Sequence, residues 1–496
     1  MLAADFYRSL LRRDPGLAAV RADLAGALLA DGDRDGAVTE SSAALAADPS
    51  LVQAWIVRAT ALKSLCRYEE AAGDFERAAA LAPERPMVLV NLGNTYAEIA
   101  RLGDAERVLR QAVAMAPGSR EALISLGSVL IKLDRPAEAE APCRAALALD
   151  PGLVAAHQNL SGILARSDPE AARFHRDAAY RRRQVFIEQA PRPERTVLVL
   201  AAAEAANVPL RDLIPRATTT VIRWYVEYAV GDPDPALAQA DVVFNAIGDA
   251  DMAPELPAAV ERFLDGRRVL NPHARVALTR RCDLPGLLAG IPGIVVPAVM
   301  RHESRDPADL SGPVLVRPIG SHGGEGLRRY DDAEALAGLQ GGARYVTQFV
   351  DYVSPDGWYR KYRVIFVGGR PYPYHLAISR HWLVHYWTAG MEQDARRRDE
   401  ERRFLANPAA AVGPVAMAAL GAIGERLGLD YAGIDFGLLP DGRLVVFEAN
   451  ATMLVHPERD ARFAYRNPAV EAIRSAFTAM LDRVGSSKTR PRLGFY

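Results

Sequence analysis

The sequence predicts a multidomain protein in which an all-α helical solenoid is followed by an α/β region. In the first third, proline recurs every 34 residues, at Pro15, Pro49, Pro83, Pro117 and Pro151. After a proline- and charge-rich stretch at residues 189–195, short runs rich in β-branched residues alternate with helical stretches, which is typical of α/β folds. A chain of 496 residues has room for roughly two to four domains.

Small residues recur in phase with these prolines. One repeated position holds Ala25, Ala59, Gly93, Gly127 and Ser161; a second holds Ala37, Ala71, Ala105 and Ala139; a third holds Ala44, Ala78, Ala112 and Ala146. Each unit is predicted to form two helices, because small residues let helices cross closely. Gly or Asp is expected to end the first helix of each pair, and proline the second.

The period and the pattern resemble those of tetratricopeptide repeats. The motifs that match directly are Leu92-Gly93-x-x-Tyr96 and Ala71-x-x-x-Phe75. We therefore expect a tetratricopeptide-repeat solenoid over residues 1–188 and a linker over residues 189–195. The first repeat is degenerate, the fifth loses phase near Asp168-Pro169, and a helix from Arg173 to Gln189 is expected to cap the solenoid.

Composition and charge exclude several classes of function. A net charge of −1 gives no overall field to attract nucleic acid or an anionic membrane. Three cysteines without a Cys-x-x-Cys motif favour a reducing cytoplasm over a disulfide framework or a zinc site. The N-terminus lacks a signal-peptide core, and no stretch is expected to approach the roughly 20 apolar residues of a membrane span. We expect a cytoplasmic protein, with a homo-oligomer left open.

The second half is predicted to contain strands separated by helices. The expected strands are Val197–Leu200, Thr219–Tyr228, Asp241–Ala246, Gly293–Val296, Val314–Val316, Tyr345–Val350, Arg363–Phe366 and Leu444–Phe447. The expected helices are Pro257–Leu264, Asp283–Leu288 and Ala409–Leu427. The charged run Asp394–Arg403 predicts a solvated helix, with a lid as the alternative.

Two segments carry the residue types that nucleotide and metal binding require. A strand at Val314–Val316 runs through Arg317-Pro318 into the loop Gly320-Ser-His-Gly-Gly-Glu-Gly326, where glycine lets backbone N–H groups approach phosphate oxygens. Further along, Asp435, Glu448 and Asn450 fall on two strands expected to form a hairpin, and Mg²⁺ prefers such oxygen ligands. Together the two segments predict ATP and Mg²⁺.

In this order, these features resemble the ATP-grasp superfamily of carboxylate–amine ligases, in particular the branch that contains glutathione synthetase and the ribosomal-protein glutamate ligases. The resemblance covers about residues 196 to 481. It implies an α/β ATP-grasp fold, with a preceding α/β domain and the start of ATP-grasp at 196–300. A nucleotide- and metal-binding domain would follow at 301–484, and then a flexible tail at 485–496.

The resemblance also implies a role for each matching residue. Arg317 and Arg363 would be catalytic cations that hold phosphate oxygens, and Arg281 would stand where the family usually has lysine. The nucleotide-binding residues would be Arg281, Arg317, Gly320, Ser321, Gly323, Gly324, Gly326, Gln348, Phe349, Val350 and Asp356. Backbone groups of Gln348 and Val350 would bind the adenine edge, and Asp356 or Asp351 the ribose. The metal ligands would be Asp435, Glu448 and Asn450.

The substrate side departs from the family pattern. The family's frequent Pro-Gly after the asparagine is replaced by Ala451–His456, so the family's substrates cannot be carried over. Residues 370–387 cluster aromatic side chains with three histidines whose spacing does not suit a metal. As a group they are expected to line the acceptor pocket, and the candidate substrate residues are His375, Ser379, Trp382 and His385.

The sequence therefore predicts an ADP-forming ligase that makes an amide, or less often an ester, through an acyl phosphate. Its substrates would be a small-molecule or peptide carboxylate and amine. Solenoids present a concave face to peptides, so we also expect a peptide or protein partner at the repeat groove near Arg58, Asn91 and Asn94, or self-assembly. Two alternatives remain: a repeat-based protein-binding scaffold with a degenerate nucleotide-binding domain, and an ATP-grasp small-molecule kinase.

Overall fold

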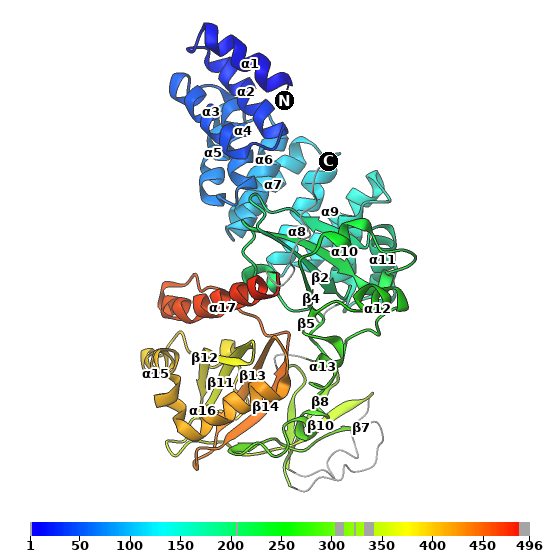
Figure 1. The fold of residues 1–496 in the computed structure, drawn as a ribbon, viewed down its shortest axis with the longest axis vertical. Coiled ribbons are helices and arrows are strands. Elements are labelled where there is room, and N and C mark those ends of the chain that lie inside the picture. Colours follow the sequence, from blue (N-terminus) through cyan, green and yellow to red (C-terminus); the bar gives the residue numbers. More distant parts are fainter. Residues whose placement is uncertain (1, 205–206, 303–311, 322–323, 332–341, 486–496) are drawn as a thin grey trace, which may run out of the picture. The chain divides into compact units, whose positions relative to one another are not determined.

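The chain forms two compact units (Figure 1). The computed structural model describes residues 2–204, 207–302, 312–321, 324–331 and 342–485. The first unit comprises Met1–Gln184 and Gln189–Pro193, and the second comprises Val185–Glu188 and Glu194–Tyr496. Of the expected tail at 485–496, only Gly485 lies within the described residues.

The first unit is a helical solenoid. After α1 (Leu2–Arg13), consecutive helices pack in pairs. The pairs are α2 (Ala18–Ala30) with α3 (Arg34–Ala47), α4 (Val52–Ser64) with α5 (Tyr68–Leu81), α6 (Pro86–Glu98) with α7 (Leu102–Met115), α8 (Arg120–Lys132) with α9 (Pro136–Leu149), and α10 (Val154–Leu164) with α11 (Pro169–Arg182). The alanines that recur in phase at 25/59, 37/71/105/139 and 44/78/112/146 are all fully buried, as close helix crossing requires.

The turn inside each repeat depends on one left-handed residue. Positive φ angles recur 34 residues apart, at Gly32 (86°), Cys66 (61°), Ala100 (58°) and Asp134 (57°). The expected Gly or Asp is therefore present in two repeats. Cys66 and Ala100 adopt the same conformation despite their Cβ atoms, at a cost of roughly 1–2 kcal/mol each.

The last repeat loses phase as predicted, but its final helix ends earlier than expected. Helix α11 begins at Pro169, one residue before the position that the 34-residue period would give, so the fifth repeat loses phase as predicted. The expected helix from Arg173 to Gln189 is wrong at its end, because α11 stops at Arg182 and Val185–Glu188 form strand β1. The run Val185-Phe-Ile favours a strand, and it pairs with a strand of the second unit.

The second unit begins with a sheet in the order β1-β3-β2-β4-β5. β1 is antiparallel to β3, and the other neighbours are parallel. The strands are β2 (Arg195–Ala201), β3 (Thr219–Tyr225), β4 (Val242–Asn245) and β5 (Val269–Leu270), with 3-10 turns at Leu210–Asp212, Val226–Tyr228 and Pro235–Gln239 and helices α12 (Ala258–Leu264), α13 (His273–Ala277) and α14 (Leu284–Leu287).

Two further sheets lie in the described part of this unit. The second sheet is antiparallel, in the order β7-β10-β8-β9, and the third has the order β12-β11-β13-β14-β6. Their strands are β6 (Ile294–Val295), β7 (Val299–His302), β8 (Val314–Pro318), β9 (Arg328–Tyr330), β10 (Arg344–Gln348), β11 (Tyr359–Val367), β12 (Arg370–Ser379), β13 (Tyr431–Leu438) and β14 (Leu444–Asn450). Each expected strand overlaps an observed one, and β13 with β14 forms the expected hairpin.

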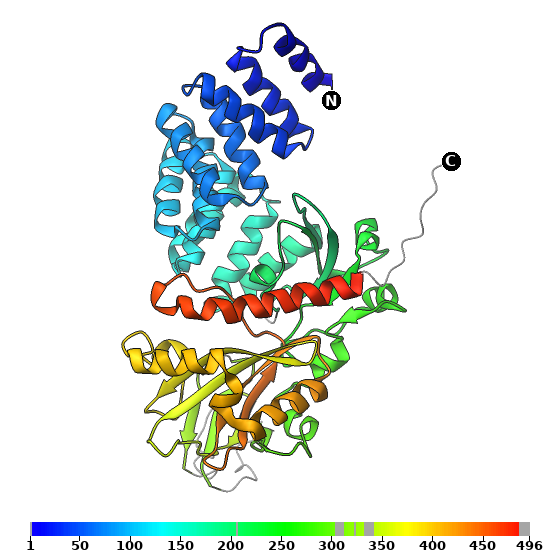
Figure 2. The ribbon, with the colours of Figure 1, turned by 60° about the vertical axis from the view of Figure 1, so that its left-hand side comes forward.

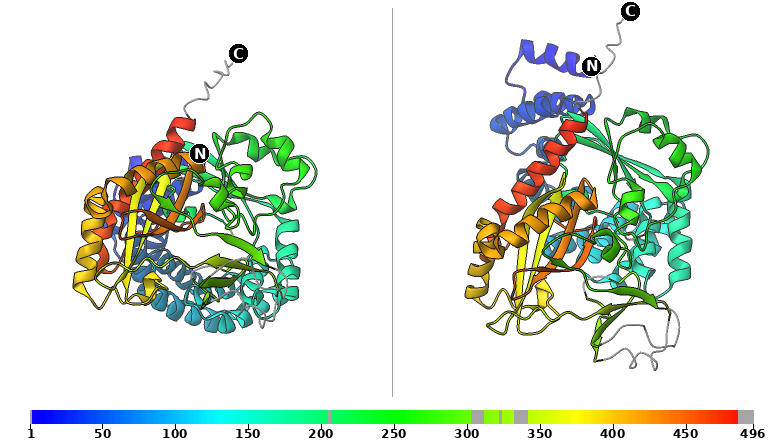
Figure 3. Two further views of the ribbon diagram at one scale, coloured as in Figure 1. Left: turned by 90° about the horizontal axis from the view of Figure 1, so that it is seen from below. Right: turned by 60° about the horizontal axis from the view of Figure 1, so that its bottom comes forward.

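Helices cover the third sheet. α15 (Ala395–Ala406) and α16 (Pro408–Leu427) pack on β12 (Figure 3), and 3-10 turns lie at Tyr386–Thr388 and Ala461–Arg466. α17 (Asn467–Gly485) contacts β11 and β12 as well as β4, so it lies between the first and third sheets (Figure 2). The expected helix at 394–403 is present as α15, with Asp394 as its N-cap, but it is only partly solvated because Glu401 is fully buried.

Helix α16 overturns one expectation from composition. It has 20 residues and a mean hydropathy of 1.3 over 18 of them, so a stretch of membrane-spanning length and composition does exist among the described residues. Gly413 interrupts the helix with non-helical dihedral angles. The side chains of Ala416, Leu420 and Ile423 are buried in the same core cluster as the strands of the third sheet, so the apolar face of α16 packs against protein.

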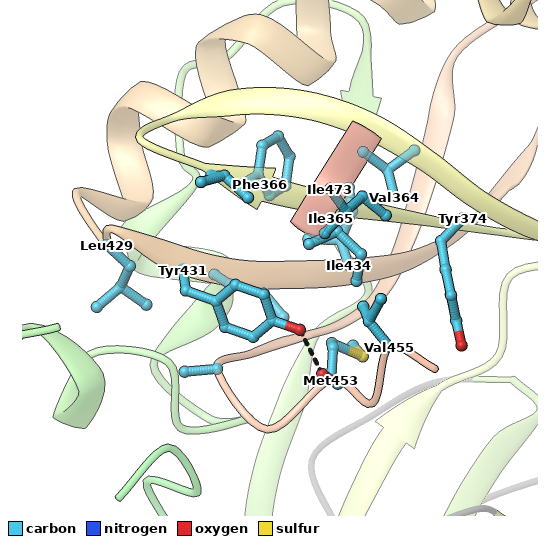
Figure 4. Close-up of a cluster of buried hydrophobic side chains, with 14 of the residues drawn as sticks. Val364, Ile365, Phe366, Tyr374, Leu429, Tyr431, Ile434, Met453, Val455 and Ile473 are labelled. Atoms are coloured by element: carbon cyan, nitrogen blue, oxygen red, sulfur yellow. Dashed lines mark hydrogen bonds between the residues drawn. The ribbon is translucent and has the colours of Figure 1, made fainter. Parts of the chain in front are cut away.

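Strand β13 passes through the centre of this core. Tyr431, Ile434 and Phe436 are fully buried, and the Tyr431 hydroxyl donates a 2.6 Å hydrogen bond to the Met453 carbonyl (Figure 4). This bond fixes the segment after β14 against the sheet. Met453 and Val455 are buried in the core, while Leu454 and His456 line the cavity described below.

Candidate functional site

One face of the third sheet carries a row of polar side chains on four neighbouring strands. The register pairs His375 of β12 with Arg363 of β11, Arg363 with Asp435 of β13, and Asp435 with Glu448 of β14. Directly paired residues point to the same face of a sheet. All four side chains line one cavity.

Ion pairs hold this row together. Arg363 donates to both carboxylate oxygens of Asp435, at 2.6 and 2.8 Å, and Lys361 Nζ lies 3.1 Å from Asp435 Oδ2. Arg281 donates to Glu448 at 2.6 Å. Two carboxylates opposite each other on neighbouring strands repel, and these three cations offset that repulsion.

Burial and charge act in opposite directions on both acids. Burial raises the pKa of Asp435, but the positive charges of Arg363 and Lys361 outweigh it, so the pKa lies below its ordinary value. Burial likewise raises the pKa of Glu448, as does the charge of Asp435, but the combined positive charges of Arg281, Lys361 and Arg363 outweigh both, so this pKa also lies below its ordinary value. Both carboxylates are therefore held ionised inside the cavity, which suits them to bind a cation.

Arg317 stands at the end of β8, where the glycine loop begins. Its side chain is 8% exposed, and Nε donates to Ser321 Oγ at 3.1 Å while Nη2 donates to the Ser321 carbonyl. Burial and the neighbouring charge of Arg281 lower the pKa of Arg317 to about 10. Two arginines that repel each other in a buried place are stabilised by an anion between them.

Other predicted nucleotide residues divide into two groups. Gly324, Gln348, Phe349 and Val350 line the cavity. The Gln348 N–H donates to the Ala298 carbonyl at 2.9 Å, so the backbone group that Gln348 could offer a ligand is its carbonyl. Gly320, Ser321 and Gly326 are not among the described residues that line the cavity, and His322 and Gly323 lie outside the described residues.

Three predicted site residues lie away from the cavity. Asp356 accepts hydrogen bonds of 2.9 and 2.7 Å from Arg360, which lower its pKa to about 2, so Asp356 is committed to an exposed ion pair. Asn450 Oδ1 accepts from the Thr452 N–H and hydroxyl at 3.0 and 3.1 Å. Ser379 Oγ accepts from the His381 N–H at 3.1 Å. The described lining includes none of the three.

The cavity has a volume of about 260 Å³, just below the range of roughly 300–1,000 Å³ that is typical of small-molecule sites. Its lining includes three of the predicted substrate residues: His375, Trp382 and His385. Among the described residues, five cationic and three acidic side chains face it: Arg281, Arg317, Lys361, Arg363, Arg466, Asp435, Glu448 and Glu458. This excess of cations suits a polyanion.

Sequence reasoning missed Lys361, Arg466, Glu458 and His456. Lys361 stands two residues before Arg363 on β11, and the period of two in a strand signals that both face the same side. His456 is the last residue of the segment Ala451–His456, which departs from the family pattern, and Glu458 follows two residues later. Arg466 carries no local signal, because its partners lie far away in the sequence or on other elements.

The donor set fits a magnesium ion in part. Asp435 and Glu448 supply oxygen ligands on facing strands, and Mg²⁺ usually takes one or two carboxylates and completes its shell with waters and phosphates. Asn450 is turned to Thr452. The described residues contain no group of three or more His, Cys, Asp or Glu placed to hold a metal, so an ion here would need a ligand that brings its own oxygens.

Comparison with known proteins concerns the helical unit. Residues 90–154 match the family model described as "Tetratricopeptide repeat". No curated protein has a sequence that matches this chain.

Several solved structures are similar over about a third of the chain. YrrB, a protein whose structure is described as having an unusual peptide-binding site, is 23% identical over 36% of this chain and 92% of its own, with a TM-score of 0.33. MamA of Desulfovibrio magneticus RS-1 is 23% identical over 32% of this chain and 90% of its own, with a TM-score of 0.31. PilF of Pseudomonas aeruginosa is 22% identical over 34% and 76%, with a TM-score of 0.31.

The repeat pattern, the paired helices and the family match agree on the first unit. The chain thus consists of an N-terminal tetratricopeptide-repeat solenoid followed by a mixed α/β region.

Proposed function

We propose that the second unit is an ATP-dependent carboxylate–amine ligase of the ATP-grasp type. The observation that carries this proposal is the pairing of Arg363 with Asp435 and of Arg281 with Glu448 inside one cavity. Burying charges is costly unless they serve as partners for each other or for a ligand. In a cavity lined by such ion pairs, the carboxylates could bind a metal ion and the arginines could bind the polyphosphate when the pairs separate.

Each side of the ion pairs has a task in this exchange. Asp435 and Glu448 would hold Mg²⁺, which supplies charge neutralisation for phosphoryl transfer when bound. The released guanidinium groups of Arg363 and Arg281 would then bind phosphate oxygens, because a planar fork donates two hydrogen bonds at once. Gln348 to Val350 line the same cavity and would receive the base.

The reaction needs positioning and no nucleophile from the protein. The substrate carboxylate oxygen attacks the γ-phosphorus of ATP, and ADP leaves with the electron pair of the broken P–O bond. The resulting acyl phosphate is attacked at its carbonyl carbon by the amine nitrogen. The C–N bond forms as phosphate leaves, and the proton lost by the nitrogen passes to phosphate or solvent. Phosphoryl transfer of this kind depends on orientation and charge stabilisation.

The test is to incubate the full chain with Mg²⁺·ATP and a panel of amino acids and short peptides, and to measure ADP and free phosphate. A ligase releases both in equal amounts when the correct pair of substrates is present. A kinase, the alternative reading, forms ADP with a phosphorylated product and no free phosphate. A chain that fails to bind Mg²⁺·ADP in calorimetry would rule out both and leave the scaffold reading.

We infer that the solenoid recruits a peptide or protein partner to this ligase. Polar side chains link its helices: Arg58 is bound to Asp74 by two 2.7 Å hydrogen bonds within one repeat, and Lys63 Nζ donates at 3.0 Å to Asn91 of the next repeat. Repeat solenoids use extended surfaces of this kind for binding. The described peptide-binding site of YrrB makes a peptide an appropriate class of partner to test.

The partner proposal has its own test. Asn91→Ala combined with Asn94→Ala should raise the KM for a peptide substrate and leave Mg²⁺·ADP affinity unchanged, because contacts remote from the phosphates contribute uniform binding. Glu84→Gln, at an exposed turn position, serves as the control. If the double substitution leaves the KM of every peptide substrate unchanged, the solenoid does not bind the substrate.

A further inference from the structure

The cavity extends past His375 to a buried polar end that the phosphate chemistry does not use. Arg281 contacts the row at Glu448 on β14, whereas His375 ends the row on β12. Next to His375 lies Tyr386, with ring centroids 4.9 Å apart. The Tyr386 hydroxyl accepts a 3.2 Å hydrogen bond from Arg466 Nη1. Arg466 and Glu458 both line the cavity at this end.

Arg466 is neutralised by two carboxylates. It is 3% exposed, Nη1 donates to Glu458, and Nε lies 3.6 Å from Glu401 Oε1. Glu401, which is fully buried, accepts from the Leu376 N–H at 3.1 Å and from the Tyr465 hydroxyl at 2.6 Å. One cation between two acids leaves no uncompensated positive charge here, so this end differs from the cationic end that suits phosphate.

The geometry presents Glu458 to the cavity. Arg466 holds one oxygen of Glu458, and the Glu458 backbone N–H donates to Asn467 Oδ1 at 2.7 Å. The side chain of Glu458 is 11% exposed, against 0% for Glu401. Of the two acids on Arg466, Glu458 is therefore the one within reach of a ligand.

A second observation points to a ligand at this end. His375 is 5% exposed and lines the cavity, and its Nδ1 has no hydrogen-bond partner among the residues that the structure describes. A buried polar atom without a partner costs free energy, and each such atom in a native structure calls for an explanation. A ligand N–H or O–H in the cavity would supply the missing partner.

We propose that this end of the cavity is the subsite for the amine substrate, with the ammonium group received by the Glu458 carboxylate and hydrogen-bonded to His375. The proposal rests on the proposed function for its place in the reaction. A compact cation with several N–H donors matches a carboxylate and an unpartnered imidazole nitrogen. A carboxylate or phosphate would instead meet Glu458 and be repelled. The amine thus enters at β12, at the opposite end of the row from Arg281.

The experiment measures ligand binding to the full chain by saturation-transfer NMR, with and without Mg²⁺·ADP. The probes are ethylamine, putrescine and the common amino acids, each amino acid compared with its 2-hydroxy acid where one exists. We expect at least one amine to bind, its 2-hydroxy analogue to bind at least tenfold more weakly, and Glu458→Gln to weaken the amine at least tenfold. His375→Phe, which keeps a ring but removes the nitrogen, should weaken the same amine.

Controls separate this inference from folding and from the proposed function. Glu471→Gln breaks an exposed Glu–Arg pair with Arg474 and should leave amine binding unchanged. Mg²⁺·ADP affinity should be the same in the wild type and in Glu458→Gln, which also shows that the variant is folded. Amine binding that survives both substitutions overturns the inference, as does a wild type that binds Mg²⁺·ADP but no amine. Failure of Mg²⁺·ADP binding alone contradicts the proposed function and leaves the amine result to stand by itself.

Discussion

Arg363 and Asp435 lie directly opposite each other on β11 and β13, and the guanidinium group donates to both oxygens of the carboxylate at 2.6 and 2.8 Å. Asp435 is 2% exposed, so the carboxylate of this pair is shielded from bulk water. In the proposed ligase the two residues separate when nucleotide binds, the acid to Mg²⁺ and the arginine to phosphate. The ion pair is then the resting state of a binding site, which explains why opposite charges are buried beside a cavity.

Asp435→Asn and Glu448→Gln should each lower ADP formation by a factor on the order of 10² or more, because metal neutralisation carries much of the barrier reduction. Both substitutions keep the shape of the side chain and remove the charge. Rates of ADP release and calorimetric titration with Mg²⁺·ADP measure the effect. Asp441→Asn, an exposed residue of the same hairpin that pairs with Arg443 at 2.7 Å, is the matched control. Near-normal turnover in purified Glu448→Gln would refute the metal assignment.

The repeat unit was predictable because its information is local and periodic. Proline, small residues and the loss of phase at Pro169 all follow from a 34-residue spacing that can be counted in the sequence. The left-handed positions at Cys66 and Ala100 were not predictable from residue type, because these residues do not favour positive φ. Cys66 and Ala100 adopt a positive φ angle because each repeat packs with the same geometry as its neighbours.

Many strands of the α/β region were predictable, although the short strands β1, β5, β7 and β9 were not, and the site was less predictable than the strands. β12 was missed because Pro371 and Pro373 argue against a strand. The structure places β12 at the edge of the third sheet, where proline is tolerated. Asp356 or Asp351 is the predicted partner of the ribose, but Arg360 lies four residues after Asp356 and pairs with it. Arg466 and Glu401 come together only through the tertiary fold, so their spacing in the sequence does not predict the contact.

Strand β1 should decide whether the second unit is stable in isolation. A truncated protein of residues 184–496 retains β1, while residues 189–496 lack it and expose the edge of β3. Val185 is buried with Trp224 in one core cluster, and an uncovered sheet edge favours aggregation. We expect the shorter protein to melt at a lower temperature and to elute as larger species in size-exclusion chromatography. Identical melting of the two proteins would show that β1 does not belong to this unit.

Close packing between repeat helices makes Gly93→Ala destabilising. A Cβ atom at Gly93 would lie 2.5 Å from Leu109 Cγ, and Leu109 is fully buried, so the new methyl group overpacks the interface at a cost of about 1–3 kcal/mol. Gly73 also lies inside a helix, but a Cβ there would meet nothing within 4 Å. Gly73→Ala should therefore stabilise the unit by up to about 1 kcal/mol through helix propensity. Denaturant unfolding followed by circular dichroism measures both, and equal shifts in the two variants would contradict the packing argument.

The paired histidines of the last repeat should make the solenoid sensitive to acid. His157 Nδ1 and His175 Nδ1 lie 2.8 Å apart, so one nitrogen must donate and the other accept, which requires at least one neutral ring. Burial, and then the charges of His157 and Arg144, lower the pKa of His175 below its ordinary value of 6.5. The unfolded chain therefore binds this proton at a higher pH than the folded one does. The contribution to stability is complete above pH 6.5 and is lost as the pH falls through the folded pKa.

The melting temperature, followed by the helical circular-dichroism signal, should therefore fall between pH 7 and pH 5 in the wild type. It should fall less in His175→Asn, because asparagine stays neutral. His381→Asn, at an exposed position of the second unit, should keep the full drop; a drop of the same size in His175→Asn would show that the pair does not control the acid response.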